Sequence, residues 1–144
     1  MDKHLALLFR GAITTQAEFV SKAAYCNAFQ PPLDSHIPPV LDHDKDKVYP
    51  PYDPTDVFEC KYELDSLASF LKLSWLYYDR MDDVSFVTST WLKAISLVMK
   101  VIEQQMEPSF DPTTGEAKYA RYTFQRLTTL GSETLPLGIF AICD

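Results

Sequence analysis

The stretch at residues 57–67 reads Val-Phe-Glu-Cys-Lys-Tyr-Glu-Leu-Asp-Ser-Leu and joins a proline-rich segment to a strongly apolar one. Charged and apolar residues are interleaved in it, whereas an ordinary amphipathic helix keeps them on separate faces. A junction between a loop and a helix is a common place for polar groups that meet a ligand. We therefore expect this stretch to lead into a long helix and to present polar side chains. Its polar candidates are Glu59, Lys61, Glu63, Asp65 and Ser66.

Working outward, residues 63 to 80 are predicted to form a helix that is buried on more than one side. Its apolar residues lie at helical spacing, and others widen the stripe beyond one face. Residues 3–24 and 84–106 are also predicted helices, and the short break at 81–83 predicts an antiparallel hairpin. The stripe of the central helix consists of Leu64, Leu67, Leu71, Trp75 and Tyr78, widened by Phe70, Leu73 and Tyr77.

Long loops separate these helices. Residues 30–54 contain seven prolines, five aspartates and no apolar periodicity, which predicts a long loop of the kind that is functional or disordered. Residues 121–130 are expected to be extended and irregular. The fold class is therefore all-α with long proline-rich loops. Three helices cannot easily surround a two-sided apolar helix, so the pattern indicates a piece of a larger helical toroid or bundle.

Composition narrows the possible functions. The 144 residues are 47% apolar, which suffices for the core of one domain, and the net charge is −7. Without a basic block, nucleic acid is not an expected partner. The apolar run at the N-terminus is too short for a signal peptide or a membrane span, and the compartment stays open.

The cysteines are Cys26, Cys60 and Cys143, an odd number without a C-x-x-C pair. We expect them to be small buried hydrophobic residues rather than a disulfide framework or a zinc site. The sequence predicts no metal site and no cofactor.

Two candidate sites each allow two interpretations. If a helix already includes Glu59, that residue and Glu63 share a face and resemble the paired carboxylates of glycoside hydrolysis. The same region equally fits a helix start capped at Asp65-Ser66. Asn27 has an amide suited to a vicinal diol, but it also fits the C-cap of the first helix.

Three motifs, in order, resemble glycoside hydrolase family 125, the metal-independent exo-α-1,6-mannosidases. The first is Tyr25-Cys-Asn-Ala-Phe29, and the second, which is the most specific, is Glu59-Cys-Lys-Tyr-Glu-Leu-Asp-Ser-Leu67. The third is Tyr122-Thr-Phe-Gln-Arg126, followed by Thr134-Leu-Pro136. The resemblance implies an (α/α)6 barrel, a mannose-containing glycan as the partner and an inverting mechanism with an acid and a base on opposite sides of the sugar.

The resemblance is partial. Relatives begin with helices that carry a Trp-Leu-Arg-Asp-Ser type segment, and their general acid lies in an Arg-Pro-Ser-Asp-Asp segment after the Thr-Leu-Pro motif. Residues 1–144 contain neither segment, so we expect a partial domain that is inactive by itself and assign no catalytic residue, Asp144 included. The alternative is a small all-α binding or scaffolding module without catalysis.

The resemblance carries over only part of a sugar-binding wall. We expect Asn27, Glu59 and Asp65 to face the sugar, while Lys61 and Glu63 pair behind it. The substrate-binding candidates are Asn27, Glu59, Lys61, Glu63, Asp65 and Ser66.

Overall fold

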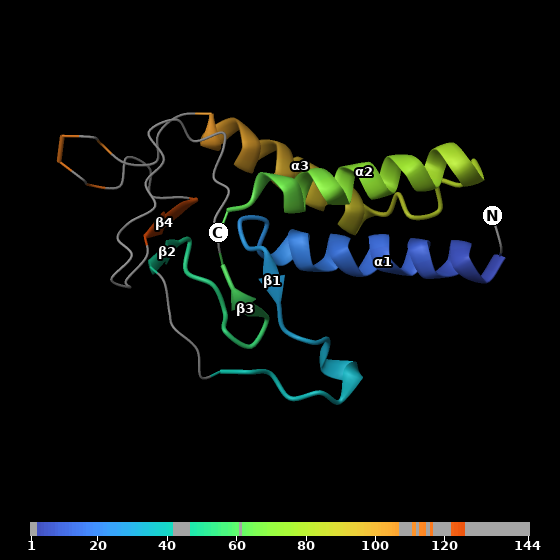
Figure 1. The fold of residues 1–144 in the computed structure, drawn as a ribbon, viewed down its shortest axis with the longest axis horizontal. Coiled ribbons are helices and arrows are strands. Elements are labelled where there is room, and N and C mark those ends of the chain that lie inside the picture. The colour runs from blue at the N-terminus through green and yellow to red at the C-terminus, as the bar shows by residue number, and fades with distance from the viewer. Residues whose placement is uncertain are drawn as a thin grey trace.

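The computed structural model describes residues 3–41, 47–60, 62–106, 111, 113–114, 116 and 122–125. Its main elements are three helices: α1 (Lys3–Lys22), α2 (Leu64–Met81) and α3 (Ser89–Gln105). In Figure 1, α2 and α3 form a hairpin, α1 lies along it, and the short strands gather at one end of the helices. The three predicted helices and the hairpin are confirmed, with shifted ends.

The late start of α3 has a local cause. Thr88 precedes the helix in an extended conformation, and its Oγ1 accepts a hydrogen bond from the backbone N–H of Trp91 at 3.2 Å. A threonine N-cap satisfies one of the amides that the first turn leaves unpaired. Residues 84–88 were predicted to be part of the helix, but they belong to the connection between α2 and α3.

Helix α1 contacts both other helices and forms the middle of the core. Its buried side chains recur at helical spacing, so one face is covered along its length. Apolar spacing along the helix would also bury Leu5 and Leu8, but both lie at the surface. Small alanines on the buried face let the neighbouring helices approach. The buried residues are Ala6, Ile13, Ala17 and Val20.

Helices α2 and α3 are joined through a buried serine. The Ser74 hydroxyl donates to the Phe70 carbonyl at 3.0 Å and accepts from Trp91 Nε1 at 3.1 Å. Both polar groups are thereby satisfied inside an apolar interface, where an unpaired group would be costly.

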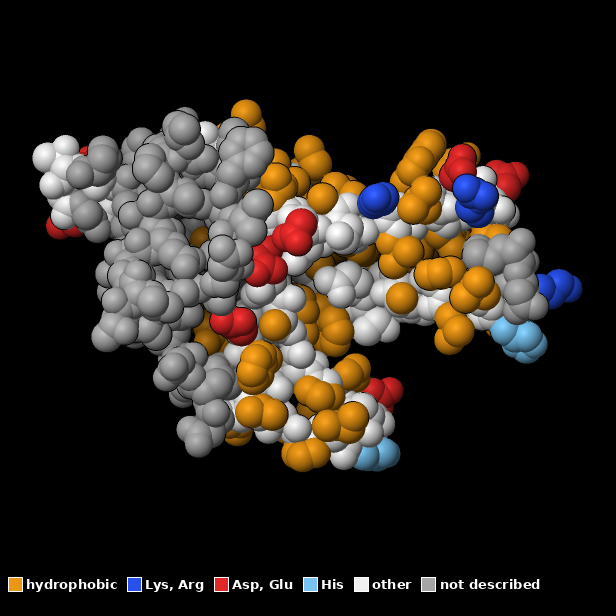
Figure 2. Space-filling model, in the orientation of Figure 1, with side chains coloured by type: hydrophobic (Ala, Val, Ile, Leu, Met, Phe, Trp, Pro, Cys, Tyr) orange, Lys and Arg blue, Asp and Glu red, His pale blue; other side chains and the backbone are white. Residues whose placement is uncertain are grey.

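Only one side of α2 is covered by the described residues. Leu67, Phe70 and Tyr77 are buried. The other side of the predicted stripe lies at the surface, where Trp75 is 61% exposed and Tyr78 is 39% exposed. Figure 2 shows hydrophobic side chains spread over the outer surfaces of the helices.

The all-α prediction was incomplete, because two small antiparallel sheets lie beside the helices. Strand β1 (Ala28–Phe29) pairs with β3 (Val57–Glu59), and β2 (Lys47–Tyr49) pairs with β4 (Thr123–Gln125). The extended conformation predicted for residues 121–130 is confirmed at β4; residues 126–130 lie outside the described part.

One buried side chain organises the proline-rich loop. The Gln30 amide donates to the carbonyls of Val40 at 2.7 Å and Pro54 at 3.1 Å, and its oxygen accepts from the Val40 N–H at 3.1 Å. A 3₁₀ turn at Leu33–Ser35 lies between these contacts. The described part of the loop is therefore ordered, and residues 42–46 lie outside it.

A carboxylate locks the turn between α2 and α3. Asp83 accepts hydrogen bonds from the Tyr77 hydroxyl at 2.7 Å and from the Ser85 N–H at 2.8 Å. Arg10 Nη1 of α1 donates to the Ser85 hydroxyl at 3.1 Å. The bond from Tyr77, followed by those from Ser85, holds the pKa of Asp83 below its usual value. The network ties α1 and α2 to the turn that leads into α3.

Replacing Ile13 tests the central position of α1. Ile13 is fully buried, so Ile13→Ala should lower the free energy of unfolding by about 2–5 kcal/mol through lost burial and a cavity. The matched control is Leu8→Ala, on the exposed side of the same helix, which should change it by about 0.5 kcal/mol or less. Urea denaturation followed by circular dichroism measures both. Equal losses would contradict the assigned face.

Replacing Tyr77 tests the turn network. Tyr77→Phe removes a donor to Asp83 and should lower the free energy of unfolding by about 1 kcal/mol at pH 7. Because the pKa of Asp83 is lowered by folding, this stabilisation is complete above the unfolded value of about 3.9 and is lost as pH falls through the folded pKa.

The difference between wild type and Tyr77→Phe should therefore shrink between pH 5 and pH 3, measured by urea denaturation at each pH. The control is Tyr78→Phe, a partly exposed neighbour on the other side of α2, which should behave as wild type at both pH values. A wild-type advantage of constant size would show that the ionised Asp83 is not the acceptor that matters.

Candidate functional site

A disulfide between Cys26 and Cys60 joins the segment after α1 to the end of β3. The expectation that these cysteines are unpaired was wrong. The two residues are 34 positions apart in sequence, so spacing alone does not reveal that the folded chain brings them together. Closing a loop of this length lowers the conformational entropy of the unfolded chain. This effect stabilises the folded state by about 3–4 kcal/mol.

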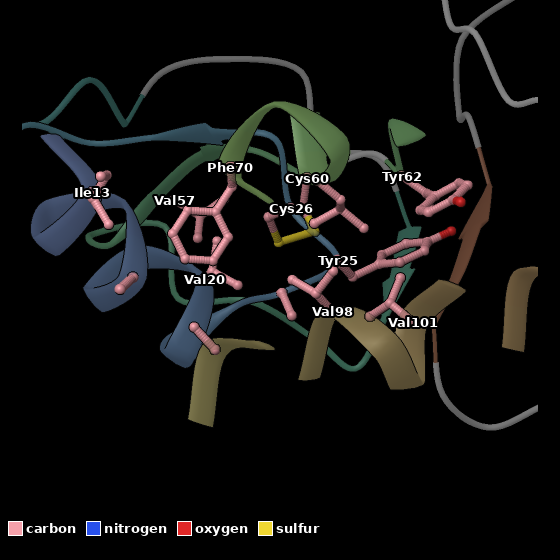
Figure 3. Close-up of a cluster of buried hydrophobic side chains, with 14 of the residues drawn as sticks. Ile13, Val20, Tyr25, Cys26, Val57, Cys60, Tyr62, Phe70, Val98 and Val101 are labelled. Carbon is pink, nitrogen blue, oxygen red and sulfur yellow. A yellow bond between two sulfur atoms is a disulfide. The ribbon is translucent and has the colours of Figure 1, made fainter. Parts of the chain in front are cut away.

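Three tyrosines stack beside the disulfide, and each comes from a different motif. The Tyr25 and Tyr62 rings lie 5.8 Å apart and nearly parallel, and Tyr122 lies 5.7 Å from Tyr25 on a tilt. Figure 3 shows Tyr25 and Tyr62 side by side in the cluster that contains the disulfide. Gln105, at the end of α3, donates from Nε2 to the Tyr122 carbonyl at 2.8 Å. The three motifs thus converge at Tyr25.

Burial has one electrostatic consequence here. Tyr62 is almost fully covered, and this desolvation raises the pKa of its phenol. The shift therefore moves ionisation of this phenol further above neutral pH. Because its ring is buried against Tyr25, we assign Tyr62 to the structural core of the junction.

The structure brings Asn27 and Glu59 to neighbouring positions. Asn27 follows Cys26, and its neighbour Ala28 is the register partner of Glu59. The C-cap interpretation of Asn27 was wrong, because α1 ends at Lys22. The helical interpretation of Glu59 was also wrong, because Glu59 lies on β3 and does not share a helix face with Glu63.

The remaining candidates lie at the start of α2. Glu63 is the N-cap residue and makes no capping bond to the backbone; its Oε2 accepts from the Ser66 hydroxyl at 3.1 Å. Asp65 is exposed in the first turn, so the predicted Asp65-Ser66 cap was wrong by two residues. Lys61, and with it the expected pairing of Lys61 with Glu63, lies outside the described residues. In Figure 2, acidic side chains gather between the start of α2 and β3.

A pocket of about 170 Å³ lies behind the disulfide. Tyr25, Tyr122 and both cysteines line it, but Asn27, Glu59, Glu63, Asp65 and Ser66 do not. At the same pocket Lys22 pairs with Asp56 at 2.7 Å, and Asp53 accepts from Thr55. The charged groups of the pocket thus already have partners within the protein. The pocket is therefore not formed by any of the five described candidates.

The described residues lack two features. Among them, no group of three or more His, Cys, Asp or Glu side chains is arranged to hold a metal ion. No helix in the described ranges is both long and apolar enough to cross a membrane.

The main features that sequence reasoning missed are the disulfide and the tyrosine stack. The available signal was that each of the first two motifs contains one cysteine and that each of the three motifs contains a tyrosine. Motifs that form one site must meet in space, so the one cysteine of the first motif could have been paired with the one cysteine of the second. The odd total number of cysteines argued against a disulfide.

The convergence of the three motifs is consistent with the family that they resemble, and comparison with known proteins supports that resemblance. The chain matches the family described as metal-independent alpha-mannosidase (GH125) over residues 1–140, and it belongs to that family. It is also 52% identical over 137 residues to the Meiotically up-regulated gene 157 protein of Schizosaccharomyces pombe. The match covers 95% of this chain and 27% of that relative, so the chain spans about a quarter of the relative's length.

Proposed function

We propose that this chain forms one wall of the mannose-binding cleft of an exo-α-1,6-mannosidase, within an (α/α)6 toroid of which residues 1–144 are a part. The proposal is carried by one observation: three family motifs, far apart in sequence, meet at the Tyr25 ring. Family membership over residues 1–140 supplies the class of reaction. The uncovered side of α2, with Trp75 and Tyr78 at the surface, supports a larger helical assembly.

Within this wall, Asn27, Glu59 and Asp65 are the proposed contacts to the sugar. An amide both donates and accepts, and carboxylates accept from two hydroxyls at once, so together they match the vicinal diols of mannose. Glu63 has a supporting role, because the Ser66 hydroxyl donates to its carboxylate. Lys61 is proposed to pair with Glu63 behind the sugar.

The wall would act by positioning. In an inverting glycosidase a carboxylic acid protonates the leaving oxygen while a carboxylate activates water on the opposite side, and the two stand about 6.5–9.5 Å apart. Hydrogen bonds to the hydroxyls hold the ring in the one orientation that suits both steps. Since residues 1–144 contain no Arg-Pro-Ser-Asp-Asp segment, we expect binding but no turnover from these residues alone.

Titration with α-1,6-linked mannobiose tests whether the proposed wall binds the sugar. Chemical-shift changes in a ¹H–¹⁵N spectrum should cluster on residues 26–28 and 58–66. Each of Asn27→Ala, Glu59→Gln and Asp65→Asn should weaken binding about tenfold or more, since a hydrogen bond to a charged group contributes about 1.5–3 kcal/mol. Glu103→Gln, an exposed acid on α3, is the control and should bind as wild type.

Two results would contradict the proposal. Equal affinity in all four variants would place the sugar elsewhere, and the absence of binding to wild type would favour the non-catalytic module. Incubation with the same mannobiose should release no mannose. Rapid release would refute the statement that the catalytic acid and base lie outside residues 1–144.

A further inference from the structure

The disulfide stands directly beside two of the proposed sugar contacts. Cys26 immediately precedes Asn27, and Cys60 immediately follows Glu59. Both cysteines are buried, with 6% and 2% of their surfaces exposed. The covalent bond therefore joins the first and second motifs at residues that are directly next to Asn27 and Glu59 in the chain.

Besides the bond, the two segments meet through the Tyr25–Tyr62 stack, the contacts of Gln30 and one short pair of strands. Strand β1 has two residues, β3 has three, and their register shifts between Ala28 and Phe29. A ladder this short is marginal by itself, and an irregular register permits slippage. A slip by one residue would turn Glu59 to the other side of the sheet. The bond removes that freedom.

We propose that the Cys26–Cys60 disulfide is a positioning element of the sugar-binding wall, which sets the register between Asn27 and Glu59. The bond forms when both thiols are oxidised, losing two electrons and two protons to a disulfide-containing oxidant that is reduced to two thiols. The chain accordingly folds in an oxidising compartment. The effect on sugar rests on the proposed function, whereas the effect on register does not.

The bond is open to experiment because Cys26 and Cys60 also line the 170 Å³ pocket. The folded protein is therefore treated with a phosphine reductant. The helices offer an internal reference, because the contacts between α1, α2 and α3 do not involve the bond. Loss of position at the wall can thus be separated from loss of the fold.

The first experiment determines the redox state. Protein isolated from its source organism is alkylated before any reduction, digested and analysed by mass spectrometry. Peptides that contain Cys26 and Cys60 should be found linked to each other. Recovery of both as alkylated thiols would overturn the proposal.

The second experiment compares Cys26→Ser/Cys60→Ser with wild type treated with a phosphine. Amide signals of Asn27 and Glu59 should shift or broaden in both samples, while those of α3 stay in place. Affinity for α-1,6-linked mannobiose should fall at least tenfold. The control is Val98→Ala, a fully buried α3 residue, which lowers stability but should retain the affinity of wild type below its melting temperature.

The outcomes separate the two proposals. If wild type binds no mannobiose, the proposed function fails, and the amide signals alone judge the positioning role. Unchanged signals of Asn27 and Glu59 after loss of the bond would overturn that role. Complete unfolding of both the variant and the reduced protein would also overturn it, because the bond would then stabilise the whole fold rather than one register.

Discussion

The described structure depends on one junction, at the end of the helices where segments distant in the sequence are held together. There the segment after α1, the end of β3 and the start of β4 must meet, although they are separated by long loops. Two interactions close this junction: the Cys26–Cys60 disulfide and the stack of Tyr25 on Tyr62 and Tyr122. Ring stacking is non-covalent and needs buried neighbours. The disulfide needs no such neighbours. It can therefore hold the junction together even though the long loops contribute little packing.

The helices impose a second constraint, because α2 is apolar on more sides than α1 and α3 cover. Its inner side is built around Phe70 and Tyr77, with the Ser74 hydroxyl satisfied between α2 and α3. Its outer side leaves Trp75 in contact with solvent. Such a helix is stable in water only at the cost of exposed apolar area, which another layer of helices would remove. This exposed apolar side is one physical basis of the proposal that the hairpin belongs to a larger helical toroid.

The candidate site could be predicted from sequence only as a set of residue types. Glu59, Glu63, Asp65 and Ser66 were singled out because polar groups interrupt an apolar pattern, and they do lie on β3 and the first turn of α2. Their geometry was not predictable. One of the two interpretations put Glu59 on a helix together with Glu63, four residues later, yet β3 ends at Glu59 and pairs with β1. The pairing partner is 31 residues away in sequence, beyond the reach of local pattern.

Sequence alone determined the three helices, the hairpin and the family motifs, because helical periodicity and short motifs are recorded within a few residues. It did not determine which side of each helix is buried. Leu8 and Ile13 are both apolar residues on the same helix, and only the position of α2 and α3 covers one and exposes the other. Tertiary structure likewise decided that Cys26 bonds to Cys60, that Asn27 lies beyond α1 rather than capping it, and that Gln30 organises the proline-rich loop. Each depends on contact between segments distant in the chain, which no local pattern encodes.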